Sequence, residues 1–433
     1  MKKLLSFADN KLVYSWALYD WANSAYATTI IAAVLPTYYS KVAAAQLAPN
    51  IASSYWAYST TIAMVLLVFM APILGAIADH KKSKLKFLFS FVVIGVTFTG
   101  LLYFIQEGDW LLASIFYILS RAGWSGANVF YDSFLPHIAQ KNEIDQVSTL
   151  GYALGYLGGA LLLALNLGMI LSPQTFGIQS TELGTQLSFL SVACWWAIFS
   201  IPLFKTIKEP VFDPATKGQK NIFRIAFERL SITFKEMRNF KQAFLFLVAF
   251  WFYNDGIGTI MVMAVIFGAE IGIGQDHLIG AILAVQLIGI PFTILFGRLA
   301  AKFDVKRAIY LGLMIYTLIS IGGYFMQSAL HFWMLAIAVG MVQGGTQALS
   351  RSVFGQMTPK KKSAEFFGFF DVSQKFSGIL GPLLFGLIGQ ISGSSRLSIF
   401  ALVIFFLCGM YILSKVNMEE GIKAATDADI RKN

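Results

Sequence analysis

Six ionisable side chains lie inside long apolar stretches of the sequence: Asp20, Arg121, Asp132, Asp255, Asp371 and Lys375. A charge inside a membrane span is costly, so such groups usually face a partner or a water-filled cavity. If the stretches are helices, Arg121 and Asp255 lie roughly 22 Å and 18 Å from the inner end, near the bilayer midplane. A cation and a carboxylate at that depth would suit a zwitterion, because each buried charge would gain a hydrogen-bonded partner.

Uncharged polar residues extend this candidate site. Arg121, Ser125, Asn128 and Asp132 recur at spacings of four, three and four, which places them on one helical face. The candidate residues for substrate binding or proton coupling are Asp20, Asn23, Arg121, Asn128, Asn254, Asp255, Gln343, Gln347 and Lys375. Hydrogen bonding between helices of one bundle is an equally open interpretation of the serine and glutamine positions. Lys375 is either a partner for Asp255 or part of a local ion pair with Asp371.

Other kinds of chemistry are excluded by what the sequence lacks. The four histidines fall at the ends of apolar stretches or between them, so they cannot form an intramembrane metal site or proton relay. There is no phosphate-binding loop of the Walker type, and the sequence offers no constellation of a nucleophile and a base for one intramembrane cavity. We therefore expect a protein that is not an enzyme and that uses no metal and no cofactor. Proton coupling through Asp20 or Asp255 stays open.

The composition indicates which elements carry these residues. Of the 433 residues, 57% are hydrophobic and 13% are charged, which excludes soluble, disordered and disulfide-stapled classes. A membrane span needs about 20 apolar residues, so the apolar content suffices for about twelve spans. We expect an all-α integral membrane protein with twelve transmembrane helices. They are predicted near residues 12–39, 55–78, 86–105, 110–135, 147–170, 186–204, 243–268, 277–297, 308–328, 332–354, 366–390 and 397–415.

Basic residues between the spans predict the orientation. They cluster in alternate connections, at 81–86, 298–307 and 360–362, so the positive-inside rule places both termini in the cytoplasm. The net charge of +10 is explained by this bias rather than by nucleic acid. The expected partners are a small-molecule substrate and the lipid bilayer, with no nucleic acid and with the chain as a monomer. The absence of a glycosylation sequon fits a bacterial inner (plasma) membrane.

A long polar connection divides the chain into two groups of six spans. We predict an N-terminal bundle over 1–204, a cytoplasmic linker with an amphipathic helix over 205–242, a C-terminal bundle over 243–415 and a cytoplasmic tail over 416–433. Spaced landmarks repeat between the halves at an offset of about 222 residues, such as Pro136 with Pro359 and Gly155 with Gly378. Two pseudo-symmetric bundles are typical of secondary transporters, with the substrate site near the midplane.

The run from Gly75 to Lys84 resembles the signature between helices two and three of the major facilitator superfamily. This resemblance implies the major facilitator fold, with helices one, four, seven and ten lining a central cavity. It also implies a conformational latch formed by Gly75, Asp79 and Lys84. Separately, small residues at regular spacing predict close helix packing at Gly151, Gly155, Gly159, Gly378 and Gly381.

Three further runs are similar to the vacuole effluxer-like branch, which is related to an autophagy-associated protein of fungal vacuoles and is also called the unknown major facilitator family. They are residues 19–25, 343–351 and 367–375. The resemblance implies a secondary active transporter that exports a small polar or zwitterionic, amino-acid-like solute by alternating access. The alternatives are a passive facilitator, and a membrane scaffold or sensor with the same fold that does not transport.

Overall fold

The computed structural model describes residues 10–47, 49–81, 83–140, 143–209, 240–392 and 395–430. These residues form helices and no strand. Each of the twelve predicted spans corresponds to a long helix or to a run of consecutive helices, as the all-α expectation requires. The predicted amphipathic helix of the linker lies outside the described residues.

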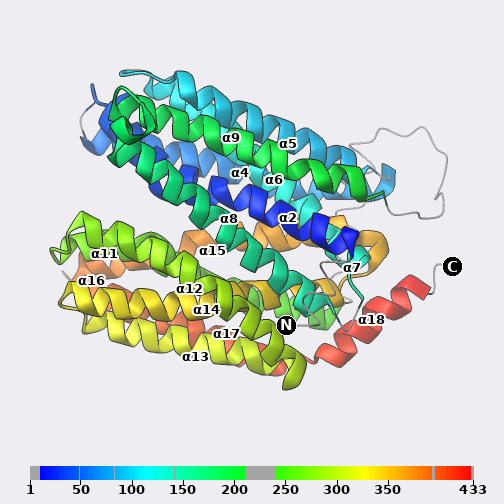
Figure 1. Cartoon of the computed structure of the whole chain (residues 1–433). Coiled ribbons are helices and arrows are strands. Elements are labelled where there is room, and N and C mark those ends of the chain that lie inside the picture. Colours follow the sequence, from blue (N-terminus) through cyan, green and yellow to red (C-terminus); the bar gives the residue numbers. More distant parts are fainter. Residues whose placement is uncertain are drawn as a thin grey trace. The chain divides into compact units, whose positions relative to one another are not determined.

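The first half of the chain contains six long helical segments (Figure 1). The first is composite, because the α-helix gives way to π-helical turns near its middle, a feature often found at functional sites. The segments are α2 (Lys11–Ala25) with η1 (Tyr26–Ala33), α3 (Leu35–Tyr38) and η2 (Tyr39–Ala43), then α4 (Pro49–Lys81), α5 (Lys84–Leu101) with η3 (Leu102–Phe104), α6 (Trp110–Ser133), the short α7 (Leu135–Ile138) and α8 (Ile144–Leu171), and, after η4 (Pro173–Phe176), α9 (Thr181–Thr206).

The second half contains another six segments and a helical tail. The last span is divided at Leu402, and the predicted tail over 416–433 contains the helix α18. The elements are α11 (Lys241–Glu270), α12 (Gln275–Lys302), α13 (Val305–Tyr324), α14 (Ala329–Gln356), η5 (Lys360–Lys362), α15 (Ser363–Ser392), α16 (Ser395–Ala401), α17 (Val403–Lys415) and α18 (Met418–Ile430). Serine side chains cap two of the long helices: Ser180 accepts from the Leu183 N–H, and Ser328 accepts from the His331 N–H.

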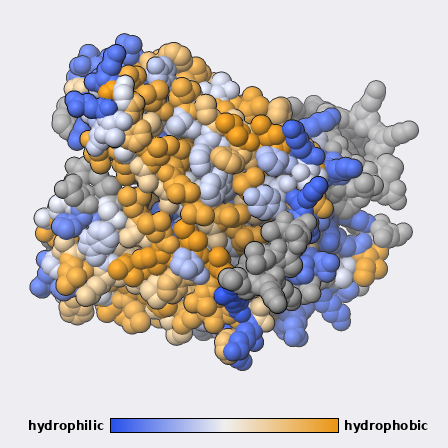
Figure 2. Space-filling model, in the orientation of Figure 1, coloured by the Kyte–Doolittle hydropathy of each residue, from blue (hydrophilic) through white to orange (hydrophobic). Residues whose placement is uncertain are grey.

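Eight helices of the described residues are long and apolar enough to cross a membrane. Helix α6 is not among them, because its polar face lowers its hydropathy. Large apolar side chains such as Leu318 and Ile404 are largely exposed, as lipid-facing residues would be. Figure 2 shows apolar side chains along the middle of the helices and polar side chains toward their ends.

The chain divides into two compact units. The first unit consists of Met1–Ala71, Lys81–Asp132 and Leu154–Val211, and the second unit consists of Pro72–His80, Ser133–Ala153 and Phe212–Asn433. This grouping differs from a split at residue 204, because two short segments of the first half pack with helices of the second half.

Aromatic side chains form much of the core in the first unit, where α9 packs against both α2 and α5. The Trp16 ring stacks on that of Tyr131 with centroids 4.6 Å apart, and the Trp16 Nε1–H donates to the Tyr131 carbonyl oxygen at 3.1 Å. Both residues are buried. Helix α2 is thereby joined to the end of α6, so the polar residues of these two helices are brought together.

The second unit has a core rich in phenylalanine, in which α12 packs against α14, and α11 packs against α15 and α17 (Figure 1). Phe370 of α15 stacks on Phe250 of α11 at 4.5 Å and on Phe354 of α14 at 5.0 Å. These contacts fix the three helices that carry the charged and amide residues of this unit.

Candidate substrate and coupling site

A pair of amides joins the first and fourth spans within the first unit. The Asn23 side-chain NH₂ donates to the Asn128 Oδ1 at 2.9 Å. The indole N–H of Trp124 donates to the Asn23 backbone oxygen at 3.1 Å, although Asn23 lies within the helix α2. Two sequence-predicted residues are therefore in direct contact, and α6 is held to α2 at the level of its polar face.

Arg121 lies about two helical turns from Asn128 and is half-buried. Its guanidinium lies over the Trp124 ring, 5.3 Å from the centroid. The Nε and Nη1 atoms are buried, and neither has a hydrogen-bond partner among the described residues. Buried N–H groups of a cation without acceptors are costly. The arrangement is chemically suited to an anion or to water that supplies the missing acceptors.

The other predicted residues of the first unit lie where α8 approaches α2. Asp20 is buried, and its backbone oxygen faces Gly155. A Cβ added at Gly155 would come within 2.5 Å of the Ser24 hydroxyl, and one at Gly159 within 2.9 Å of the Thr28 methyl. These glycines therefore allow α8 to touch α2. Gly151 is buried in the part of α8 that belongs to the second unit.

The second unit contains a corresponding pair of amides between the seventh and tenth spans. The Gln347 side-chain NH₂ donates to the Asn254 Oδ1 at 2.6 Å. One turn away, the hydroxyl groups of Tyr253 and Ser350 are 2.6 Å apart. The contact repeats the one between Asn23 and Asn128 in the first unit, because in each case the first and fourth helices of a half are joined by side-chain amides.

Asp255 is only 1% exposed. Its Oδ1 accepts a hydrogen bond from the Gly381 backbone N–H at 2.9 Å, so the carboxylate packs against α15 within its own unit. Its Oδ2 is buried and has no hydrogen-bond partner among the described residues. The sequence suggested a carboxylate that faces an open cavity, whereas this one is enclosed and has a single unsatisfied oxygen.

Gly381 makes this enclosure possible. An added Cβ there would overlap the Thr259 hydroxyl and would come within 2.9 Å of the Asp255 backbone oxygen. Gln343, another predicted residue, has a buried Oε1 without a partner in the described part of the chain. The side chain of Lys375 and the surroundings of Gly378 lie outside what the structure describes.

The residues of the predicted latch are divided between the units. Gly75 belongs to the second unit, and a Cβ there would come within 2.5 Å of the Ala364 carbonyl oxygen of α15. Lys84 is buried at the start of α5 in the first unit. The Asp79 side chain lies outside the described residues.

Glu209 is a structural residue that the sequence did not reveal. Its Oε1 accepts from the Lys84 backbone N–H at 2.7 Å, and its Oε2 accepts from the Leu85 backbone N–H at 2.9 Å. The carboxylate thus satisfies two free N–H groups at the N-terminus of α5, where negative charge is favoured. The two residues are far apart in sequence, and no local capping motif signals the contact.

Arg351 is the second residue that sequence reasoning missed. It is 3% exposed, and its Nε and Nη2 donate to the Ser148 hydroxyl and the Ser148 carbonyl oxygen, each at 2.9 Å. Its guanidinium also lies 4.4 Å from the centroid of the Tyr152 ring. The sequence did contain a signal, because Arg351 is a basic residue inside the 343–351 run. We interpreted that run only as a resemblance to the vacuole effluxer-like branch.

A second set of contacts lies beside Arg351. The Ser148 hydroxyl donates to the Ala348 carbonyl oxygen at 2.8 Å. Asp145 accepts hydrogen bonds from the Ser352 hydroxyl and, at 3.0 Å, from the Gln356 side-chain NH₂. The first two turns of α8 are therefore bonded along the last turns of α14.

Comparison with known proteins agrees with this architecture. A family model described as "Vacuole effluxer Atg22 like" matches residues 49–426. The chain belongs to this family. It is 40% identical over 422 residues to the uncharacterized MFS-type transporter YxiO of Bacillus subtilis (strain 168), with 97% of each protein covered. It is 25% identical, over an alignment of 459 residues, to Autophagy-related protein 22 of Yarrowia lipolytica, covering 86% of this chain and 77% of that protein.

The chain has the fold of the major facilitator superfamily. The proton:xylose symporter XylE, solved with 6-bromo-6-deoxy-D-glucose, is similar to this chain with a TM-score of 0.72 at 12% identity, over 96% of this chain and 98% of that one. The chain is therefore a multi-pass membrane protein of the transporter superfamily, and its relatives are not enzymes.

Proposed function

We propose that the protein is a secondary active transporter that exports a small zwitterionic, amino-acid-like solute in exchange for protons. The observation that carries this proposal is the Asp255 Oδ2, a buried carboxylate oxygen without a partner in the described residues. A buried charge that is only half bonded is expensive to keep unless it has a use. An ammonium group or a proton would each satisfy it.

Competition for this one oxygen is the proposed coupling step. The solute's ammonium group binds Oδ2 when the carboxylate is ionised. A proton on Oδ2 removes the negative charge and releases the ammonium group, so the two cannot be carried together. In the described arrangement Asp255 is enclosed, and we assign exchange of solute and proton to a different state of the transport cycle.

Arg121 is the proposed group for the solute's carboxylate. A guanidinium presents N–H groups in a planar fork that matches the two oxygens of a carboxylate. Its Nε and Nη1 are buried and have no hydrogen-bond partner in the part of the chain that the structure describes, and the guanidinium lies over the Trp124 ring. Asp20, the amide pairs and Gln343 are proposed to contact the polar parts of the solute.

The contacts of Arg351 are proposed to belong to the closed state of one membrane face. Alternating access requires that helices which touch in one state separate in another. The start of α8 is bonded to the end of α14 by Arg351 and Asp145. The run from Gly75 to Lys84 is proposed as a latch on the same face, where Gly75 allows close contact with the start of α15. We place this face, and both termini, in the cytoplasm, on the basis of the flanking lysines.

Counterflow in proteoliposomes tests the function directly. Vesicles loaded with an unlabelled amino acid should accumulate the labelled one, and an imposed pH gradient should drive net movement. Counterflow that is insensitive to the pH gradient would favour a passive facilitator. Absence of both, for a panel of amino acids and folded protein, would favour a scaffold or sensor and contradict transport of this substrate class.

A further inference from the structure

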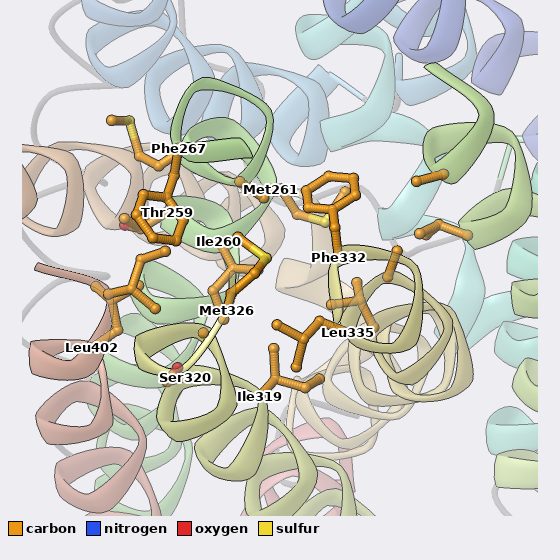
Figure 3. A pocket seen from close by; sticks show the side chains of 18 of the residues that line it. Thr259, Ile260, Met261, Phe267, Ile319, Ser320, Met326, Phe332, Leu335 and Leu402 are labelled. Atoms are coloured by element: carbon orange, nitrogen blue, oxygen red, sulfur yellow. The ribbon is translucent and has the colours of Figure 1, made fainter. Parts of the chain in front are cut away.

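An apolar cavity of about 100 Å³ lies inside the second unit. It is lined by the later part of α11, the first turns of α12, the end of α13, the first half of α14, and the residues around the junction of α16 and α17 (Figure 3). The cavity is partly open, and the lining residue Met261 is 40% exposed. Its lining contains no charged side chain. A zwitterion would leave both of its charges unpaired there, so the cavity is not suited to the solute proposed above.

Methionine and aromatic side chains give the cavity its chemical character. Met261, Met263 and Met326 line it together with Phe267 and Phe332. Figure 3 shows Met261, Met326, Phe267 and Phe332 among the side chains that line the cavity. Methionine sulfur makes favourable contacts with aromatic rings, and aromatic pairs prefer edge or offset contacts. A flat ring fits this surface better than a polar or charged group.

Three polar side chains, those of Thr259, Gln286 and Ser320, interrupt the apolar lining. Ser320 of α13 is fully buried, lines the cavity, and has an Oγ without a hydrogen-bond partner among the described residues. The other lining hydroxyl, that of Thr259, already donates to the Asp255 carbonyl oxygen at 2.7 Å. Ser320 therefore has an unused donor and acceptor facing the cavity.

Both features are costly when nothing fills the space. Apolar side chains that line an unfilled space lose dispersion contacts on that side. A buried hydroxyl without a partner adds a desolvation cost. Apolar cavities only somewhat larger than this one remain dry and bind benzene. One compound with a single ring and one hydrogen-bonding atom would offset both costs.

We propose that this cavity binds a small neutral aromatic compound that carries one hydroxyl group, with Ser320 as its hydrogen-bonding partner. The compound enters from the membrane, where neutral aromatic alcohols dissolve. Thr259 lines the cavity, and its hydroxyl donates to the Asp255 carbonyl oxygen one turn earlier in α11. An occupant of the cavity would therefore stabilise α11 next to Asp255. The binding step itself does not depend on the proposed transport activity.

Fluorine NMR of the full chain in lipid nanodiscs tests the proposal with two matched probes, fluorobenzene and 4-fluorophenol. Both should show saturable binding, and 4-fluorophenol should bind about five- to tenfold more tightly, the effect of one additional buried hydrogen bond. In Ser320→Ala this preference should disappear while fluorobenzene still binds. Ala281→Leu, which adds bulk at a lining position, should abolish saturable binding of both probes.

Controls separate the site from lipid partitioning and from misfolding. Ser398→Ala removes another fully buried hydroxyl of this unit, one that has no hydrogen-bond partner among the described residues and does not line the cavity, so it should leave the preference unchanged. Ala336→Leu fills the cavity from α14 and replaces Ala281→Leu if that variant does not fold. Equal signals in the wild type and a folded cavity-filled variant would overturn the proposal. The proposal would also be overturned if a long-chain alcohol displaced the probes and Ser320→Ala had no effect on their binding. That result would indicate that the cavity holds a lipid tail.

Discussion

Arg351 donates two hydrogen bonds of 2.9 Å to a single residue, Ser148, one to its hydroxyl and one to its backbone oxygen. The two residues belong to different halves of the sequence but to the same compact unit. The contact ties the start of α8 to the last turns of α14. If α8 and α14 separate in the proposed transport cycle, both hydrogen bonds must break.

Substitution of Arg351 should therefore affect both stability and transport. Arg351→Ala should lower the free energy of unfolding by about 2 to 4 kcal/mol, because it leaves buried acceptors unpaired. Arg351→Lys should retain only part of the stability. The ammonium group keeps the charge, but it cannot reproduce the planar fork of the guanidinium. Thermal unfolding and counterflow rates measure the two effects.

A matched control is Arg396→Ala. The Nη1 of Arg396 donates to the Tyr324 carbonyl oxygen at an exposed position. Its loss should change the unfolding temperature and the counterflow rate little. Equal behaviour of the Arg351→Ala and Arg396→Ala proteins would show that the buried contact has no special role.

Glu209 should stabilise α5 through its contact with the first turn. Glu209→Gln removes the charge and one acceptor oxygen, so we expect a loss of about 1 kcal/mol in the free energy of unfolding. Hydrogen exchange of the α5 amides should become faster near Lys84 and Leu85. Glu107→Gln, an exposed position between spans, provides the comparison and should leave this exchange unchanged. If the two amides are equally protected in the Glu209→Gln and Glu107→Gln proteins, Glu209 does not cap α5.

Gly381 should not tolerate a side chain. Gly381→Ala would force the new methyl group into the Thr259 hydroxyl and toward the backbone of Asp255, at a cost of about 1 to 3 kcal/mol. Gly258→Ala is the control, because its added Cβ would meet nothing within 4 Å although it lies in the same helix as Asp255. Thermal unfolding of the two purified variants gives the comparison. An equally stable Gly381→Ala protein would mean that α15 does not lie as close to α11 as described.

The sequence was sufficient to predict the helices, because apolar runs of span length leave few other solutions. It located the polar faces of α6 and α14, and direct contacts do join Asn23 to Asn128 and Gln347 to Asn254. It could not give the surroundings of Asp255. Depth along a helix follows from counting residues, but the side toward which a carboxylate points depends on the neighbour that a glycine such as Gly381 admits.

Long-range polar contacts escaped sequence reasoning for the same physical reason. Glu209 binds backbone N–H groups more than a hundred residues away, and backbone groups are the same at every position. Arg351 binds a serine, which carries no complementary charge that a pattern search would pair with it. Charge patterns predict partners only when both partners are charged.

Transport by Asp255→Asn protein tests the central claim most directly. The amide keeps an oxygen for the Gly381 N–H but cannot exchange a proton at the position of Oδ2. We predict that pH-driven transport in proteoliposomes falls to background while counterflow of the same amino acid is retained in part. Asp109→Asn, at a loop position where Oδ2 accepts from the Gln106 N–H, should retain both activities. Full pH-driven transport by the Asp255→Asn protein would contradict the proposed exchange of solute and proton at this carboxylate.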